Sequence, residues 1–179
     1  MKPYQIPYVS IGSPPSKIAR GFQNYYLIKY VEKPVLNPKE IKNEWNKLMK
    51  FNDSMNDEEI NWNWKWANKL NYKLYLDSKY WLIISSKKKL DVGCCENCGS
   101  SKNLEVHHTS YNIKGNEHNN MDKLIVVCKE CHKKIHGIVK AIYNSKMSKS
   151  KNLSYEFTSN SSNSLDGTLF LALLKLPPE

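Results

Sequence analysis

The sequence lacks several features that would assign it to a familiar class of protein. It has no membrane-spanning stretch, since the apolar segment 169–174 is far too short to cross a bilayer. It has no phosphate-binding glycine loop, and only 7 of its 179 residues are glycine, which argues against nucleotide sites built on such loops. No internal repeat is present, so repeat architectures are excluded. The length suits one domain with an appended segment.

Histidine and cysteine are absent outside residues 94–136, and this is the most informative absence. All 5 cysteines and all 5 histidines of the chain fall inside that segment. The core of the segment reads Cys95-x-x-Cys98, then His107-His108, then Cys128-x-x-Cys131-His132-x-x-x-His136. Neither chance nor ordinary core packing explains such a concentration of two metal-binding residue types, so it indicates metal chemistry.

The two Cys-x-x-Cys pairs predict a structural zinc site. Each pair lets two thiolates converge on one ion, and the pairs Cys95/Cys98 and Cys128/Cys131 together complete a tetrahedral shell of sulfur. Disulfide bonding is the alternative, but no secretory signal opens the sequence, so we expect a cytoplasmic location and reduced thiols. Cys94 is then a spare thiol, with the rival interpretation that it replaces Cys95 as a ligand.

The histidines predict a second metal site of a different kind. His132 and His136 are four apart in a segment with helical spacing, so both imidazoles can reach one ion. His107 and His108 are adjacent in a predicted strand over 104–108, where neighbouring side chains point to opposite faces. One of these two can therefore be a third ligand, and the other can lie beside the ion as a general base. Three histidine ligands leave open positions for water and substrate, which is typical of a catalytic site.

Several motifs, occurring in the right order, resemble the HNH endonucleases over about residues 75–140. The motifs are Cys95-Glu-Asn-Cys98-Gly99, Leu104-Glu-Val-His107-His108-Thr-Ser-Tyr111, Gly115-Asn116-Glu117 and Leu124-Ile-Val-Val-Cys128-Lys-Glu-Cys131-His132-Lys-Lys-Ile-His136. Upstream, Tyr75-Leu76-Asp77-Ser78-x-x-Trp81 is similar to the lead-in helix of phage and prophage members. The resemblance implies an α+β protein: a small ββα-metal nuclease core with a four-cysteine structural zinc, preceded by helices.

The resemblance also implies a role for each matching residue. The four paired cysteines match the structural zinc ligands. His107 matches the first ligand of a catalytic divalent ion (Mg²⁺, Mn²⁺, Ni²⁺ or Zn²⁺), and His108 matches the general base. His132 and His136 match the remaining ligands, with His132 contacting phosphate in some members. The implied reaction is hydrolysis of DNA phosphodiester bonds to 5′-phosphate and 3′-hydroxyl ends. A non-catalytic zinc-stabilised DNA-binding module and a purely structural zinc protein are the other possibilities.

One position departs from the family pattern. The middle residue of the motif, usually Asn or Asp immediately before the position of Leu124, is Lys123, and the spacing before it is longer than usual. In His-His members this residue braces a loop more than it binds metal. Asn119, Asn120 or Asp122 is expected to take over that role.

The charge of the chain fits a DNA partner. Lysine and arginine total 27 against 17 acidic residues, for a formal net charge of +10, and Arg20 is the only arginine. Lysine meets phosphate as a point charge, whereas bidentate reading of guanine favours arginine, so we expect contact mostly with the DNA backbone. Lys129, Lys133 and Lys134 flank the second cysteine pair and are the favoured phosphate contacts. The alternative is that lysines only solvate the surface of a protein from an AT-rich genome.

Composition and periodicity divide the chain into four parts. We expect an N-terminal extension (1–36) with one strand near 25–31, a helical lead-in (37–90), the nuclease domain (91–143), and a Ser/Asn-rich linker with a short apolar tail (144–179).

Three local signals place helices in the lead-in. Asn37 followed by Pro38 predicts a helix start. The segment 60–76 alternates like a strand, but acidic residues before it suit a helix N-terminus, and helix is favoured. Ser78 is expected to cap a further helix reaching Leu90.

Overall fold

The computed structural model describes residues 12–28 and 35–137. The protein is α+β, mostly helical with one two-stranded antiparallel sheet, as the sequence predicted. It divides into two compact units: Met1–Asp91 with Ile113–Asp122, here called the helical unit, and Val92–Asn112 with Lys123–Glu179, here called the sheet unit. In the part of the chain described, no helix is long and apolar enough to cross a membrane.

The helical unit opens with a helix where the sequence predicted a strand. α1 (Lys17–Phe22) runs directly into a π-helical turn (Gln23–Leu27), so the strand expected over 25–31 is wrong for residues 25–27. The physical reason is a spacing of four between Phe22 and Tyr26, which puts both rings on one helical face with centroids 5.0 Å apart and buries both. Residues 29–31, together with the linker and tail expected over 144–179, lie outside the described residues.

α2 (Pro38–Asp53) begins where its cap residues predicted. The Asn37 side chain accepts a hydrogen bond from the backbone of Glu40 at 2.9 Å, and the Glu40 carboxylate accepts one from the Asn37 N–H at 2.8 Å. This capping box satisfies two N–H groups that the first helical turn leaves without a partner. Ile41 and Leu48, seven residues apart and so on one face of the helix, are buried.

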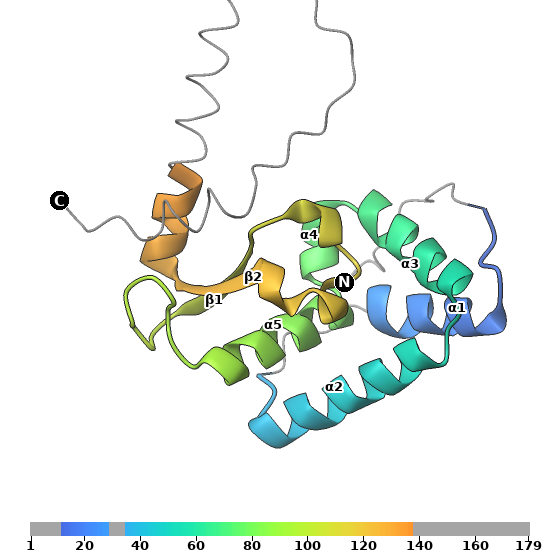
Figure 1. The fold of residues 1–179 in the computed structure, drawn as a ribbon, viewed down its shortest axis with the longest axis horizontal. Helices are drawn as coiled ribbons and strands as arrows, with labels where there is room; N and C mark the ends of the chain where they lie inside the picture. The colour runs from blue at the N-terminus through green and yellow to red at the C-terminus, as the bar shows by residue number, and fades with distance from the viewer. Residues whose placement is uncertain (1–11, 29–34, 138–179) are drawn as a thin grey trace, which may run out of the picture. The chain divides into compact units, whose positions relative to one another are not determined.

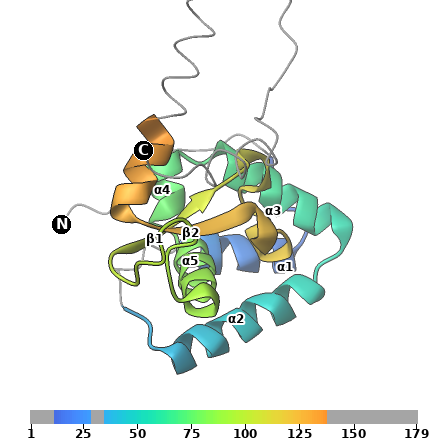
Figure 2. The same cartoon turned by 60° about the vertical axis from the view of Figure 1, so that its left-hand side comes forward.

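The ambiguous segment 60–76 is helical, which confirms the favoured interpretation. It forms the larger part of α3 (Asp57–Lys69) and all of α4 (Tyr72–Leu76), with a break at Leu70, whose backbone is extended. Three acidic residues lie in the first turn of α3, where they complement the helix dipole. Figures 1 and 2 show the helices of this unit in two views.

α5 (Lys79–Val92) also begins at its predicted cap. The Ser78 hydroxyl accepts a hydrogen bond from the Trp81 N–H at 3.2 Å, and Trp81 and Ile84 are buried. α5 leads the chain towards the first cysteine pair, where the sheet unit starts.

The sheet unit contains both strands and the helical segment that follows them. β1 (Leu104–His108) pairs antiparallel with β2 (Leu124–Cys128), so that Leu104 faces Cys128 and His108 faces Leu124. Residues 129–137 are helical and continue directly from β2 (orange in Figures 1 and 2). This order matches the predicted strand at 104–108 and the predicted helix after the second cysteine pair. The buried apolar core of the unit is made by Cys95, Ile125, Val127, Cys128, Cys131 and Ile135, with Leu104 packed against it.

Most of the loop that connects β1 to β2 packs in the helical unit, apart from the two strands. Residues 113–122 belong to the helical unit. Glu117 is fully buried there; one of its oxygens accepts from the Tyr75 hydroxyl at 2.5 Å and the other from the Gly115 N–H at 2.7 Å. Gly115 has φ +91°, and a Cβ at this position would lie 2.5 Å from the Ala67 side chain. Glycine is therefore required for the loop to lie this close to α3.

His118 forms a second anchor for this loop. The Tyr80 hydroxyl lies 2.7 Å from its Nδ1, and Asn52 Oδ1 lies 2.8 Å from its Nε2. Burial lowers the pKa of His118 to about 4, against a smaller opposing effect of Glu117. The ring is therefore neutral at physiological pH, and His118 is a buried structural residue.

Candidate metal centres

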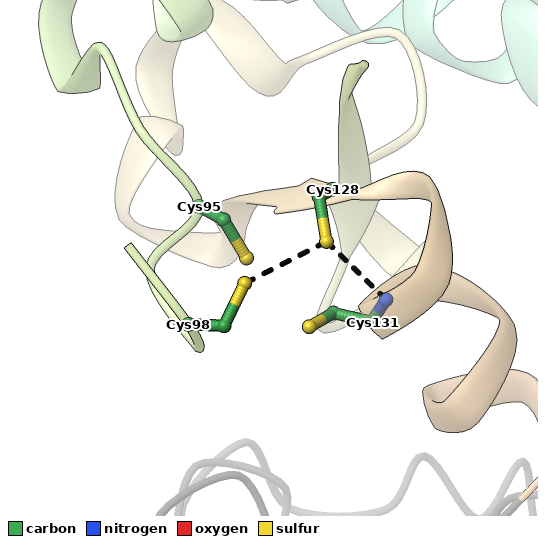
Figure 3. A group of neighbouring side chains, drawn as sticks. All are labelled: Cys95, Cys98, Cys128 and Cys131. Carbon is green, nitrogen blue, oxygen red and sulfur yellow. Dashed lines mark hydrogen bonds between the residues drawn. The ribbon is translucent and has the colours of Figure 1, made fainter. Parts of the chain in front are cut away.

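Four thiols converge in the sheet unit. The Sγ atoms of Cys95, Cys98, Cys128 and Cys131 all lie within 4.8 Å of one another. Figure 3 shows the side chains pointing inwards from the loop of the first pair, from the end of β2 and from the helical segment after it. Cys94 is half-buried and lies outside this group, so the structure brings in Cys95 and not its neighbour.

Backbone hydrogen bonds position the first cysteine pair. The N–H of Cys95 donates to the carbonyl of Ser100 at 2.8 Å, which closes the loop on itself. The Glu96 N–H then donates to the carbonyl of Val126 at 2.8 Å, and the Val126 N–H donates to the Glu96 carboxylate at 2.5 Å. These two bonds tie the loop to β2, the strand that ends at the second pair.

The geometry of the thiols fits a tetrahedral metal ion such as zinc. The Sγ atoms of Cys98 and Cys128 are 3.7 Å apart, close to the edge of about 3.8 Å that a tetrahedral ion with bonds of about 2.3 Å requires. All five cysteines are free, and the separation is far beyond a sulfur–sulfur bond. A zinc ion held by these four sulfurs would have a closed shell, with no open position for a substrate.

Burial and hydrogen bonding shift the thiol pKa values in opposite directions. Burial, with the neighbouring thiols, raises the pKa of Cys131 to about 12, even though the Asn97 amide donates to its sulfur at 3.2 Å. Burial also raises the pKa of Cys95, but hydrogen bonds from the backbone of Cys128, Cys98 and Asn97 outweigh it and lower the value to about 6. Thiols this close cannot all ionise without a cation, so binding of zinc must release protons.

Three imidazoles converge in a second group in the same unit. His107 Nδ1 lies 2.9 Å from His132 Nε2, and His136 Nε2 lies 3.1 Å from the same atom. Nitrogen ligands at about 2.1 Å from one ion are about 3.0 Å apart at right angles and about 3.4 Å apart in a tetrahedron. The observed distances fit such a set of ligands on one face of an ion.

Electrostatics favours neutral, metal-binding rings in this group. Burial, followed by the charges of His132, His136 and His108 in that order, lowers the pKa of His107 to about 3. Burial and then His132 also lower the pKa of His136. At physiological pH these two imidazoles are therefore uncharged and have a lone pair for a cation.

Glu105 orients one of the three rings, a role that was not predicted from the sequence. Its carboxylate Oε2 lies 2.5 Å from His132 Nδ1. A carboxylate at Nδ1 keeps the proton there, so the lone pair of Nε2 points at the other two histidines. Glu105 lies two residues before His107 on β1 and so on the same strand face, and this spacing is the signal that could have identified it.

His108 is separated from the three-histidine group. Only 2% of it is exposed, and its ring stacks on Tyr111 with centroids 5.6 Å apart and an interplanar angle of 26°. Its charge nevertheless contributes to the lowered pKa of His107, so it lies within electrostatic range of the group.

Lys123, the departure from the family motif, braces the loop through its backbone. Its carbonyl accepts from the Thr109 N–H at 2.9 Å and from the Thr109 hydroxyl at 3.0 Å. Asn119 and Asn120 instead donate within their own loop, and Asp122 is exposed. The brace immediately after β1 therefore needs no particular side chain at position 123.

The three lysines expected to contact phosphate share a helical segment with two of the histidines. Lys129, Lys133 and Lys134 are all exposed on residues 129–137. Lys133 pairs with Glu130 at 3.2 Å, and both side chains are largely exposed. An exposed pair of this kind contributes little to stability, so it leaves the lysine available to a phosphate at small cost.

The chain matches no protein-family model, no curated protein and no solved structure. The likeness to the HNH endonucleases therefore rests on the sequence motifs alone. The function of the two centres follows from their donor atoms and surroundings.

Proposed function

We propose that this protein is a metal-dependent DNA endonuclease of the HNH type, with β1, β2 and the helical segment after them as its ββα-metal core. The observation that carries the proposal is the convergence of three imidazoles, His107 from a strand and His132 and His136 from the next helix. Three imidazole ligands on one face of an ion leave the other positions for water and substrate.

Each centre has a different task in this proposal. The four thiols hold a structural zinc, which ties the loop of the first cysteine pair to the end of β2. The three imidazoles hold a divalent ion, with Glu105 keeping His132 in the binding orientation. When bound, that ion supplies charge stabilisation to the phosphate and the leaving oxygen.

The chain's own side chains carry the proton and the substrate. His108 accepts a proton from the water whose oxygen attacks phosphorus. The bond from phosphorus to the 3′ oxygen breaks, and that oxygen takes a proton from solvent, which gives 5′-phosphate and 3′-hydroxyl ends. Lys129, Lys133 and Lys134 meet backbone phosphates, in line with a net charge of +10 and a single arginine.

The burial of His108 favours a second candidate. Only 2% of the His108 surface is exposed, and its ring is covered by Tyr111, so little of it can contact water. If that burial persists on DNA, the chain is a zinc-stabilised DNA-binding module without catalysis. That alternative gives no role to the convergence of His107, His132 and His136, so it ranks second.

The test is incubation of the zinc-loaded protein with supercoiled plasmid in Mg²⁺, Mn²⁺, Ni²⁺ or additional Zn²⁺. The parent should nick or linearise the plasmid with at least one of these ions. His108→Ala should lose about 10²- to 10⁴-fold in rate, the usual contribution of a general base, while keeping its fold and metals. His118→Gln is the matched control, because this histidine is anchored in the helical unit, and it should keep the parent's rate.

Two outcomes separate the candidates. Binding of DNA that weakens steeply with salt, without cleavage under any ion, would favour the DNA-binding module. Cleavage by His108→Ala at the parent's rate would remove His108 as the base.

A further inference from the structure

Tyr111 stands out among the exposed side chains of the sheet unit. The large apolar side chains that are exposed in the described residues are Ile18, Tyr25, Val35, Tyr72, Leu90 and Tyr111. All but Tyr111 lie in the helical unit. Tyr111 has 51% of its surface exposed, although its ring stacks on His108.

The Tyr111 ring is fixed by stacking on His108 and by hydrogen bonds of the residues next to it in the chain. His108, almost fully buried, supports one face of the phenol at an interplanar angle of 26°. Before Tyr111, Thr109 is fixed to the Lys123 carbonyl by two hydrogen bonds of 2.9 and 3.0 Å. Around it, the Ser110 hydroxyl donates to Asn112 Oδ1 at 2.6 Å. An exposed aromatic ring whose other face is already packed needs little ordering when it binds a flat partner.

Within the described residues of the sheet unit, few other groups suit contact with bases. Arg20 is the only arginine and lies on α1 in the helical unit, so bidentate reading of guanine has no candidate in the sheet unit. Trp66 on α3 is only 5% exposed and belongs to the core, so it is not available for stacking on a base. A stacking contact at Tyr111 is sequence-tolerant, which suits a protein rich in lysine and poor in arginine.

We propose that Tyr111 is a stacking platform for a nucleobase next to the scissile phosphate, and that the substrate is DNA with unpaired bases at the cut site. The inference rests on the proposed nuclease function and deepens it. In an intact duplex both faces of each base are covered by neighbouring bases, whereas an unpaired base can place one face on the phenol ring. The adjacent His108 then lies next to the phosphate of the same nucleotide.

The test uses a short single strand carrying one 2-aminopurine and the same strand annealed to its complement. Each is mixed with the zinc-loaded protein without a further divalent ion, and affinity and 2-aminopurine fluorescence are measured. Tyr111→Ala should bind the single strand about 5- to 150-fold more weakly, the range of base–aromatic stacking, and should lose the quenching. Tyr111→Phe should restore both, because the aromatic face is kept. Binding to the duplex should change much less.

Controls make each outcome decisive. Tyr72→Ala removes a comparably exposed tyrosine (44%) from the helical unit and should bind as the parent does. If Tyr111→Ala loses zinc or its fold, Tyr111→Leu keeps apolar packing on His108 and should show the same loss. If the parent binds the single strand and Tyr111→Ala binds it with the same affinity and the same quenching, Tyr111 is not a stacking platform. A parent that binds neither DNA instead overturns the proposed function itself.

Discussion

A substitution of Glu105 tests metal binding by the three histidines without changing a ligand. Glu105→Gln keeps the size of the side chain but removes the charge that holds the proton on His132 Nδ1, 2.5 Å away. Removing such a partner of a ligating histidine usually weakens metal binding about 10- to 100-fold. The Glu105 side chain is 43% exposed, so solvent screens its charge and the expected loss lies near tenfold, or about 1.4 kcal/mol.

Isothermal titration of the zinc-loaded protein with Ni²⁺ measures this loss. Glu130→Gln is the matched control, since Glu130 is an exposed carboxylate of the same unit and pairs with Lys133. It should keep the parent's affinity, while Glu105→Gln weakens it and Glu105→Ala weakens it at least as much. Equal affinities for Glu105→Gln and the parent would refute the role of this carboxylate in orienting His132.

Three further predictions concern the structural zinc, a buried histidine and the lysines. Cys128→Ala, or chelation of zinc, should unfold the sheet unit, because a structural zinc contributes about 10–16 kcal/mol in small zinc-folded peptides; loss of hydrogen-exchange protection of the β1 and β2 amides would show it, and unchanged protection would speak against a structural role. The pKa of His118 is about 4 in the fold, below its usual value, so the unfolded chain takes up the proton first and stability falls as pH drops from about 6.5 to 4. Urea unfolding at pH 6.5 and at pH 4 should show that His118 accounts for about 3 kcal/mol of the free energy of unfolding lost between them. His118→Gln should not lose this part of its stability, and an equal loss in the variant would contradict the role of His118. Lys129→Ala and Lys134→Ala should each lower the slope of log affinity against log salt by about 1 in DNA binding, and an unchanged slope would exclude the phosphate contact.

Local patterns in the sequence were sufficient for the helix starts and for the two groups of metal-binding side chains. The capping residue Asn37 and the cap Ser78 place the starts of α2 and α5 because a helix N-terminus needs a side-chain acceptor. The spacing of four between His132 and His136 predicts a shared face because the helix turns every 3.6 residues. In each case the relevant partners are close in sequence.

The features that the sequence did not reveal depend on partners far apart in the chain. Glu117 is hydrogen-bonded to Tyr75, and His118 to Asn52 and Tyr80, across 38 to 66 residues. No pattern of neighbouring residues therefore predicts that this loop packs in the helical unit. The π-helical turn at Gln23–Leu27 replaced a predicted strand because packing of its aromatic rings outweighed the local preference of its residues for strand.

An anomalous-diffraction map of the zinc-loaded protein in crystals soaked with Mn²⁺ tests both metal centres directly. We expect two separate ions: zinc among Cys95, Cys98, Cys128 and Cys131, and a second ion at about 2.0–2.2 Å from one nitrogen each of His107, His132 and His136. A map with an ion among the thiols and none within reach of the three imidazoles would contradict this expectation.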